Sequence, residues 1–123
     1  MINNRKIGNF GEDLAVNFLE RKGYRILARN YYIRGGELDI IAEQRDEVVF
    51  VEVKTRLSNI YGYPEEGVTF LKQEKMARAI RAYMGDSIHE KYFRIDIIAI
   101  EIDRETKRAS IRHIKNVVVN FQI

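Results

Sequence analysis

Residues 35–56 have the sequence GGELDIIAEQRDEVVFVEVKTR, and this stretch decides the fold. It contains two runs typical of β-strands, 38–42 and 48–54, separated by the short polar segment 44–47, so we predict an antiparallel hairpin. Because side chains alternate along a strand, one face of this hairpin would be wholly apolar, which fixes its register. The residues on that face would be Leu38, Ile40, Ala42, Val49, Val51 and Val53.

The opposite face of the hairpin would carry charged side chains. If 44–47 form the connection, counting back along both strands places Asp39 opposite Glu52. The same register places Glu37 opposite Lys54. Two opposed carboxylates cost stability, and partial burial raises that cost, so a compensating cation is expected.

A divalent metal ion is the cation that this arrangement favours. Mg²⁺, with Mn²⁺ as a substitute, is bound by one or two carboxylates together with waters and phosphate oxygens. Lys54 follows Glu52 by two residues on the same face, where it could hold or activate a water. Asp, Glu and Lys side chains arranged around Mg²⁺ can catalyse phosphodiester hydrolysis.

A simpler interpretation stays open for the same face. Glu37 and Lys54 could form a cross-strand ion pair on the solvated side of an antiparallel sheet. Against it, three apolar residues share the acidic face and indicate that another element covers it. They are Ile41, Val48 and Phe50.

The rest of the chain predicts an α/β or α+β domain with one mixed sheet. Apolar spacing predicts helices over 7–22 and 70–84, which end at Gly23 and Gly85. Further strands are expected at 24–33, 93–102 and 109–114, a glycine-punctuated loop at 57–67 and an undefined tail from 117.

The composition limits the possible functions. The 123 residues suit a single domain spanning 1–123, and the apolar fraction of 46% is enough for a core. The net charge of +3 permits a nucleic-acid partner without requiring one. The chain has no cysteine, no signal-peptide core and no apolar run of about 18 residues, so we expect a cytoplasmic protein without a membrane partner.

Six sequence segments resemble the YraN-type family of small bacterial proteins, which are described as uncharacterised and endonuclease-like. These are GNFGEDLA at 8–15, GYRILARNY at 23–31, GGELDIIA at 35–42, VVFVEVKTR at 48–56, LKQEK at 71–75 and FRIDIIAI at 93–100. More broadly, Asp39 followed by Glu52-Val53-Lys54 resembles the PD-(D/E)xK nuclease superfamily, with Leu38 in place of the motif's proline, which is not a ligand.

This resemblance implies a restriction-endonuclease-like core, a mixed central β-sheet flanked by helices in the order α-β-β-β-α-β-β. It implies that Asp39 and Glu52 bind the metal with the Val53 carbonyl as a third ligand, and that Lys54 is the catalytic lysine. A glutamate from the first helix completes the acidic cluster in related nucleases, and Glu12 is the candidate here.

Several other residues are candidates for supporting roles. Gln73, near the centre of the apolar face of helix 70–84, could cap a backbone or reach into the site. Gly8 and Gly11 suggest close packing, either of the first helix on the sheet or of a phosphate near its first turn. Arg94 and Asp96 suggest an ion pair, and Tyr61 and Tyr63 suggest either packing or stacking on bases. The candidates for phosphate contacts are Arg5, Lys6, Arg34, Arg56 and Lys72.

The function predicted from the sequence is metal-dependent, endonuclease-like phosphodiester hydrolysis on DNA or RNA, and the sequence leaves structure-specific cleavage and a homodimer open. The alternative is a nucleic-acid-binding or assembly module that keeps the nuclease fold without cutting.

Overall fold

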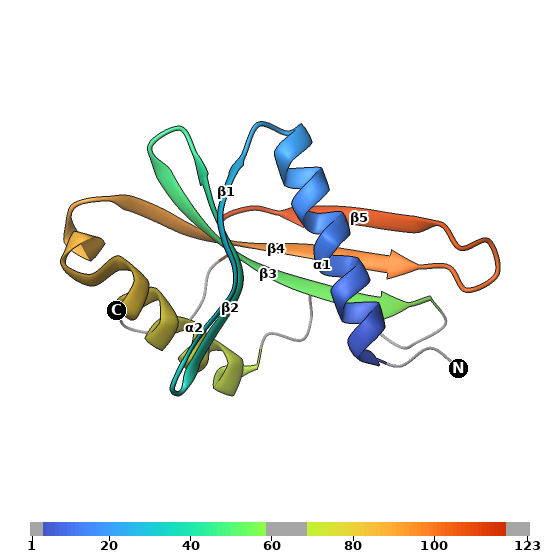
Figure 1. Ribbon diagram of the computed structural model, residues 1–123, viewed down its shortest axis with the longest axis horizontal. Helices are drawn as coiled ribbons and strands as arrows, with labels where there is room; N and C mark the ends of the chain where they lie inside the picture. The colour runs from blue at the N-terminus through green and yellow to red at the C-terminus, as the bar shows by residue number, and fades with distance from the viewer. Residues whose placement is uncertain (1–3, 59–68, 118–123) are drawn as a thin grey trace.

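The computed structural model describes residues 4–58 and 69–117. Along the chain it contains α1 (Asn4–Arg21), β1 (Arg25–Ile33), β2 (Gly36–Gln44), β3 (Glu47–Leu57), α2 (Phe70–Met84), the short 3-10 helix η2 (Gly85–His89), β4 (Tyr92–Ile102) and β5 (Ala109–Ile114) (Figure 1). The predicted order of helices and strands is confirmed. The short helix η2 was not predicted, and β2 and β3 extend further than predicted, because the connection is only Arg45–Asp46.

The five strands form one mixed sheet in the order β1-β2-β3-β4-β5. The pairs β1–β2, β2–β3 and β4–β5 are antiparallel, whereas β3 and β4 run parallel from Glu47↔Tyr92 to Leu57↔Ile102. A parallel pair needs a long crossover connection, and α2 lies within it. In Figure 1, β1 and β2 cross the direction of β3, β4 and β5, so the sheet is strongly twisted.

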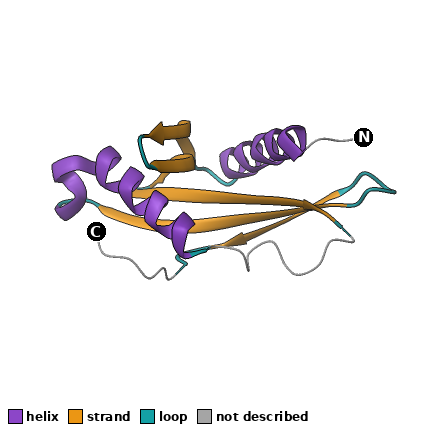
Figure 2. Cartoon of the chain, turned by 90° about the horizontal axis from the view of Figure 1, so that it is seen from below, coloured by secondary structure: helices purple, strands orange, loops and turns teal. Residues whose placement is uncertain are grey.

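Each helix packs on its own face of the sheet. Ala15 and Leu19 of α1 pack with Ile40, Val49 and Val51 in one buried cluster. A second buried cluster lies on the opposite face and contains Met76, Ala79, Ile80, Ile41, Val48 and Phe50. The element predicted to cover the face with Ile41, Val48 and Phe50 is therefore α2. Both views place the two helices towards opposite ends of the long axis of the molecule (Figures 1 and 2).

One residue of the predicted apolar face lies on the other side. Leu38 packs in the α2 cluster with Ile41, whereas Ile40 packs under α1, so the alternation predicted for Leu38, Ile40 and Ala42 is wrong at Leu38. On the neighbouring strand, Tyr31 is likewise packed on the α2 side. Both departures flank Asn30, which has the left-handed φ of 52° in the middle of β1. The left-handed backbone at Asn30 interrupts the regular alternation beside Tyr31, which pairs with Leu38.

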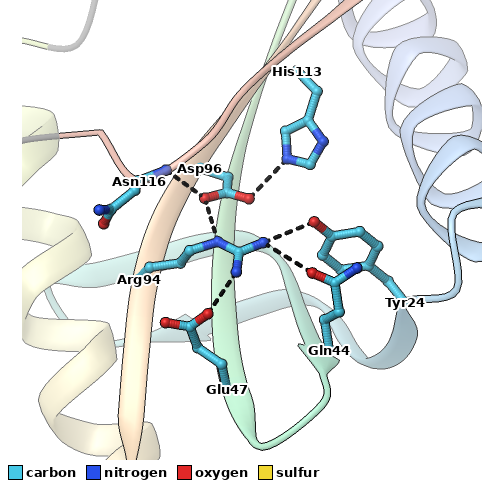
Figure 3. A network of polar contacts seen from close by, with 7 residues as sticks. All are labelled: Tyr24, Gln44, Glu47, Arg94, Asp96, His113 and Asn116. Carbon is cyan, nitrogen blue, oxygen red and sulfur yellow. Dashed lines mark hydrogen bonds and ion pairs between the residues drawn. The ribbon is translucent and has the colours of Figure 1, made fainter.

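A buried polar network ties β4 to its neighbours (Figure 3). Asp96 is fully buried. Its carboxylate accepts hydrogen bonds from Arg94 Nε at 3.0 Å and from the Asn116 backbone N–H at 2.9 Å. The same carboxylate lies 2.7 Å from His113 Nε2. Arg94 also bonds Glu47 at 2.6 Å and the Tyr24 hydroxyl at 2.7 Å. The ion pair predicted between Arg94 and Asp96 is confirmed.

Some predictions fall outside the described residues. Tyr61, Tyr63 and most of the loop predicted at 57–67 lie there, as does the end of the tail. In the described parts of the chain, neither helix has the length and apolar character that crossing a bilayer requires.

Candidate functional site

A cavity of about 580 Å³ lies where β2 and β3 part. Their ladder includes Glu43↔Val48, as predicted, but it ends at Ile40↔Val51, so Asp39 and Glu52 are not ladder partners. Past that point the Asp39 side chain bridges the strands instead, because its Oδ2 accepts the Val53 N–H at 2.8 Å. The lining residues are Arg5, Ile7, Gly8, Asn9, Glu12, Asn30, Tyr32, Asp39, Glu52, Val53, Lys54, Thr55, Arg56 and Leu57.

Asp39 and Glu52 form a buried carboxyl pair in this cavity. Their side chains share a hydrogen bond, and Glu52 is only 4% exposed. Burial, followed by the charge of Asp39, raises the pKa of Glu52 to about 8. Burial also raises the pKa of Asp39. The repulsion predicted between these two groups is therefore present, and it favours the protonated form of Glu52 when no cation is bound.

Glu52 Oε2 is a buried oxygen without a hydrogen bond to any described residue. Lys72 Nζ lies 3.4 Å from it, close enough for charge attraction but not aligned as a donor. The hydrogen bond of Lys72 goes to Glu37 Oε1 at 2.6 Å, and it lowers the pKa of Glu37. Lys72 thus compensates the acidic group only in part.

Glu12 reaches the cavity from α1. Burial raises its pKa, and the charge of Asp39 raises it further. Arg29 Nη2 lies 3.5 Å from Glu12 Oε1, and the side chain of Asn30 also hydrogen-bonds Glu12. Two neighbouring residues of β1 therefore hold this glutamate at the site.

Gly11 sets the position of Glu12 along the sheet. A Cβ atom built on Gly11 would lie 1.9 Å from Thr55 Oγ1, so only glycine allows α1 to come this close to β3. The packing role predicted for Gly11 is confirmed. A Cβ on Gly8 would meet no atom within 4 Å, so Gly8 makes no such contact and lines the cavity instead.

The donors in the cavity fit a hard divalent cation. Within the described ranges no group of three or more His, Asp or Glu side chains stands ready to enclose a metal. Mg²⁺, however, is held by one or two carboxylates and keeps several waters. Asp39 and Glu52 provide the carboxylates, and Oε2 of Glu52 provides a buried oxygen without a hydrogen bond, whose charge Lys72 compensates only in part.

The structure brings most of the predicted site residues together. Val53, Lys54, Arg5 and Arg56 line the cavity with the acidic groups, and the charge of Lys54 lowers the pKa of Glu52. Lys72 also reaches the carboxylates.

Three predicted residues lie apart from the cavity. Lys6 lines a separate hollow with Asp13 on the outer side of α1, and Arg34 is exposed near the β1–β2 turn. Gln73 is half-buried in the first turn of α2, where its backbone N–H bonds the Thr69 carbonyl, and it is not among the described residues that line the cavity.

Asn30 and Tyr32 also line the cavity, and neither was predicted as a site residue. The Tyr32 hydroxyl donates to Asn30 Oδ1 at 3.1 Å. Partial burial and the carboxylates of Asp39, Glu12 and Glu37 raise the pKa of Tyr32. One signal was available: asparagine is disfavoured inside a strand and tolerates the left-handed conformation, so its place within 24–33 marked an irregularity.

Comparison with known proteins places the chain in a family. The sequence profile of the uncharacterised protein family UPF0102 matches residues 11–100, which include α1 from Gly11 onward and the three carboxyl groups of the cavity, Glu12, Asp39 and Glu52. The chain belongs to the UPF0102 family. The resemblance to the YraN-type family that the sequence predicted is thereby confirmed.

Individual UPF0102 relatives match nearly the full length. A UPF0102 protein of Clostridium botulinum strain Okra is 44% identical over 122 residues, covering 98% of this chain and 97% of that protein. A UPF0102 protein of Alkaliphilus oremlandii is 45% identical over 114 residues, covering 92% and 97% respectively. The names of these UPF0102 proteins describe no activity.

Proposed function

We propose that this UPF0102 protein hydrolyses phosphodiester bonds in nucleic acid with the help of a divalent metal ion. The observation that carries the proposal is the unbonded oxygen of Glu52, buried beside Asp39 in a cavity that also contains cationic side chains. A buried polar atom without a partner is costly, and a metal ion offsets that cost.

The predicted site residues that line the cavity each have a role in this proposal. Asp39 and Glu52 hold the cation, the Val53 carbonyl offers a third oxygen, and Glu12 binds through a water or directly. A cation held by these residues would supply an activated water and would stabilise negative charge on phosphate. Lys54 positions the attacking water and stabilises the charge that develops in the transition state.

The cationic side chains at the cavity would bind the phosphates of the substrate. Arg5 comes from the start of α1 and Arg56 from the end of β3, so they approach the same cavity from two elements. Arginine forms paired hydrogen bonds with phosphate oxygens, so these two residues hold the backbone on either side of the bond that is cut. Lys72, held by two carboxylates, would act on the substrate only after releasing one of them.

One observation supports a second candidate, a nucleic-acid-binding module that does not cut. Lys72 Nζ lies 2.6 Å from Glu37 and 3.4 Å from Glu52, so the chain already supplies part of the positive charge that the carboxylates need. In that case the site would be stable without metal. Added Mg²⁺ would not change the melting temperature of the protein and would not lead to cleavage of the bound nucleic acid.

The two candidates are separated by incubating the protein with branched, single-stranded and duplex DNA and RNA, with Mg²⁺ or Mn²⁺ and with chelator. Metal-dependent cleavage by the wild type that is lost in Lys54→Ala supports hydrolysis. Lys91→Ala is the matched control, because Lys91 is exposed just before β4 and does not line the cavity. Binding without cleavage of any substrate in either metal would support the second candidate.

A further inference from the structure

Tyr32 presents an aromatic ring at the cavity without burying it. The side chain is 61% exposed, although the residue lies within β1 and pairs with Glu37. Its neighbour Tyr31 turns to the opposite face, where it packs edge-on against Tyr83 with ring centroids 5.5 Å apart. The ring of Tyr32 therefore contributes to neither core cluster, and the packing of the fold does not explain it.

The exposed ring is nevertheless held in place. Its hydroxyl donates to Asn30 Oδ1 at 3.1 Å, and the same Asn30 side chain hydrogen-bonds Glu12. Asn30 has a φ of 52°, a left-handed conformation that asparagine tolerates better than most residues. Arg29 and Asn30 are consecutive, yet both contact Glu12, which strict alternation along a strand would not allow. The irregularity in β1 thus connects the ring to the acidic site.

The surroundings of Tyr32 indicate what would lie on it. The same cavity contains the carboxyl pair proposed to hold a metal ion and the arginines proposed to hold phosphates. A nucleotide whose phosphate reaches the carboxyl pair would place its base near the rim, where the ring is exposed. Aromatic rings bind bases by stacking, whatever the base, and a ring that is already fixed loses little entropy when it does so.

We propose that Tyr32 is a stacking platform for an unpaired base next to the phosphate that is cut, which makes single-stranded or branched nucleic acid the substrate class of this site. A base inside an intact duplex is already stacked on its neighbours and paired, so it cannot lie on the ring without being extruded, which costs its pairing and stacking energy. A nucleotide in a single strand, flap or junction avoids that cost. This inference rests on the proposed function of the same site.

The test is a binding measurement that does not depend on cleavage. A single-stranded oligonucleotide containing the fluorescent base 2-aminopurine, and a duplex of the same sequence, are titrated with protein in Ca²⁺, and the strand lengths are checked afterwards. The variants are Tyr32→Leu, which removes the ring, and Tyr32→Phe, which keeps it. Tyr92→Leu is the matched control, since Tyr92 is 80% exposed and lines a separate hollow at the start of β4.

For Tyr32→Leu we expect single-strand affinity to fall by about 5-fold to 150-fold, which corresponds to the stacking energy of one base. Duplex affinity should change by less than about 2-fold, because no base reaches the ring. Quenching of 2-aminopurine on binding should persist in Tyr32→Phe and in Tyr92→Leu and be lost in Tyr32→Leu.

Three results would overturn the stacking role: unchanged single-strand binding in Tyr32→Leu, an equal loss on duplex and single strand, or a loss in Tyr32→Phe as large as in Tyr32→Leu. The last would assign the effect to the hydroxyl and its bond to Asn30. If any of these occurs while the wild type still cuts nucleic acid in Mg²⁺, only the stacking role falls. If the wild type neither binds nor cuts any substrate, the proposed function falls with it.

Discussion

Replacing Glu52 with glutamine tests the buried carboxyl pair directly. Glu52→Gln keeps the shape of the side chain and removes the charge that the metal-free protein accommodates poorly. Asp39 is a less suitable target, because its carboxylate also accepts the Val53 N–H, and weakening that bond would cost stability for another reason.

The sign of the effect follows from the pKa of Glu52. Its pKa in the folded protein is about 8, above the ordinary value of 4.5, so the folded state holds a proton that the unfolded state releases between those two pH values. The metal-free wild type therefore loses stability as the pH rises from about 4.5 to about 8. Glutamine does not titrate, so the variant lacks this loss.

The size of the effect follows from the same pKa. A difference of about 3.5 between the folded and ordinary pKa values, at about 1.4 kcal/mol for each pH unit, corresponds to about 5 kcal/mol. Entry of water into the open cavity would reduce this figure. We expect the variant to match the wild type within about 1 kcal/mol at pH 5 and to exceed its free energy of unfolding by about 2–5 kcal/mol at pH 9.

Urea denaturation at pH 5 to 9, with chelator, would measure this difference. All other titrating groups are shared, so subtracting the two curves isolates Glu52. Glu101→Gln is the matched control, because Glu101 is exposed on β4 and its replacement measures the effect of a Glu-to-Gln change outside the cavity. In a second series at pH 8, Mg²⁺ at one hundred times its dissociation constant should stabilise the wild type by about 2.7 kcal/mol and the variant far less.

A stability difference that does not change with pH would show that Glu52 is not held protonated in the metal-free protein. Equal stabilisation of wild type and variant by Mg²⁺ would remove Glu52 from the metal site.

Three further predictions concern the cavity and the helix beside it. Gly11→Ala should destabilise the protein despite a gain of about 1 kcal/mol in helix propensity, because the new Cβ would collide with Thr55. Gly8→Ala should be neutral or stabilising, and thermal melts with chelator measure both variants. Equal effects of the two substitutions would contradict the close contact with Thr55. Lys54→Ala should abolish cleavage while nucleic-acid binding survives, and comparable cleavage would remove Lys54 from the mechanism. Replacing Arg5 and Arg56 together with alanine should make the salt dependence of duplex binding shallower by about 0.9 per lost phosphate contact; an unchanged slope would exclude both as contacts.

Local sequence patterns predicted much of the fold because they are set by nearby residues. Helical spacing and Gly85 placed the end of α2, and alternation with a polar turn placed β5 at the residues where it lies. The pairing of Glu43 with Val48 followed from the short connection between the two strands. The same reasoning failed at Leu38, since the left-handed Asn30 on the neighbouring strand is not visible in the pattern of β2 itself.

The candidate site could be predicted only in part, because several of its contacts join distant segments. Asp39 and Glu52 are on one hairpin, so their proximity could be counted from the sequence. The contact of Lys72 with Glu37 spans 35 residues and depends on how α2 docks. The bond from Arg94 to Tyr24 spans 70 residues and depends on the parallel pairing of β3 with β4, which no local pattern specifies.

The left-handed residue in β1 has a consequence beyond the cavity. β1 is an edge strand of the described sheet, and a regular edge strand offers its outer backbone groups as a template for strands of other molecules. At Asn30 the backbone leaves the extended conformation, so a foreign strand could not pair continuously along β1. The exposed arginines Arg25 and Arg29 add charge to the same edge. The irregularity that shapes the cavity therefore also protects the protein against edge-to-edge aggregation.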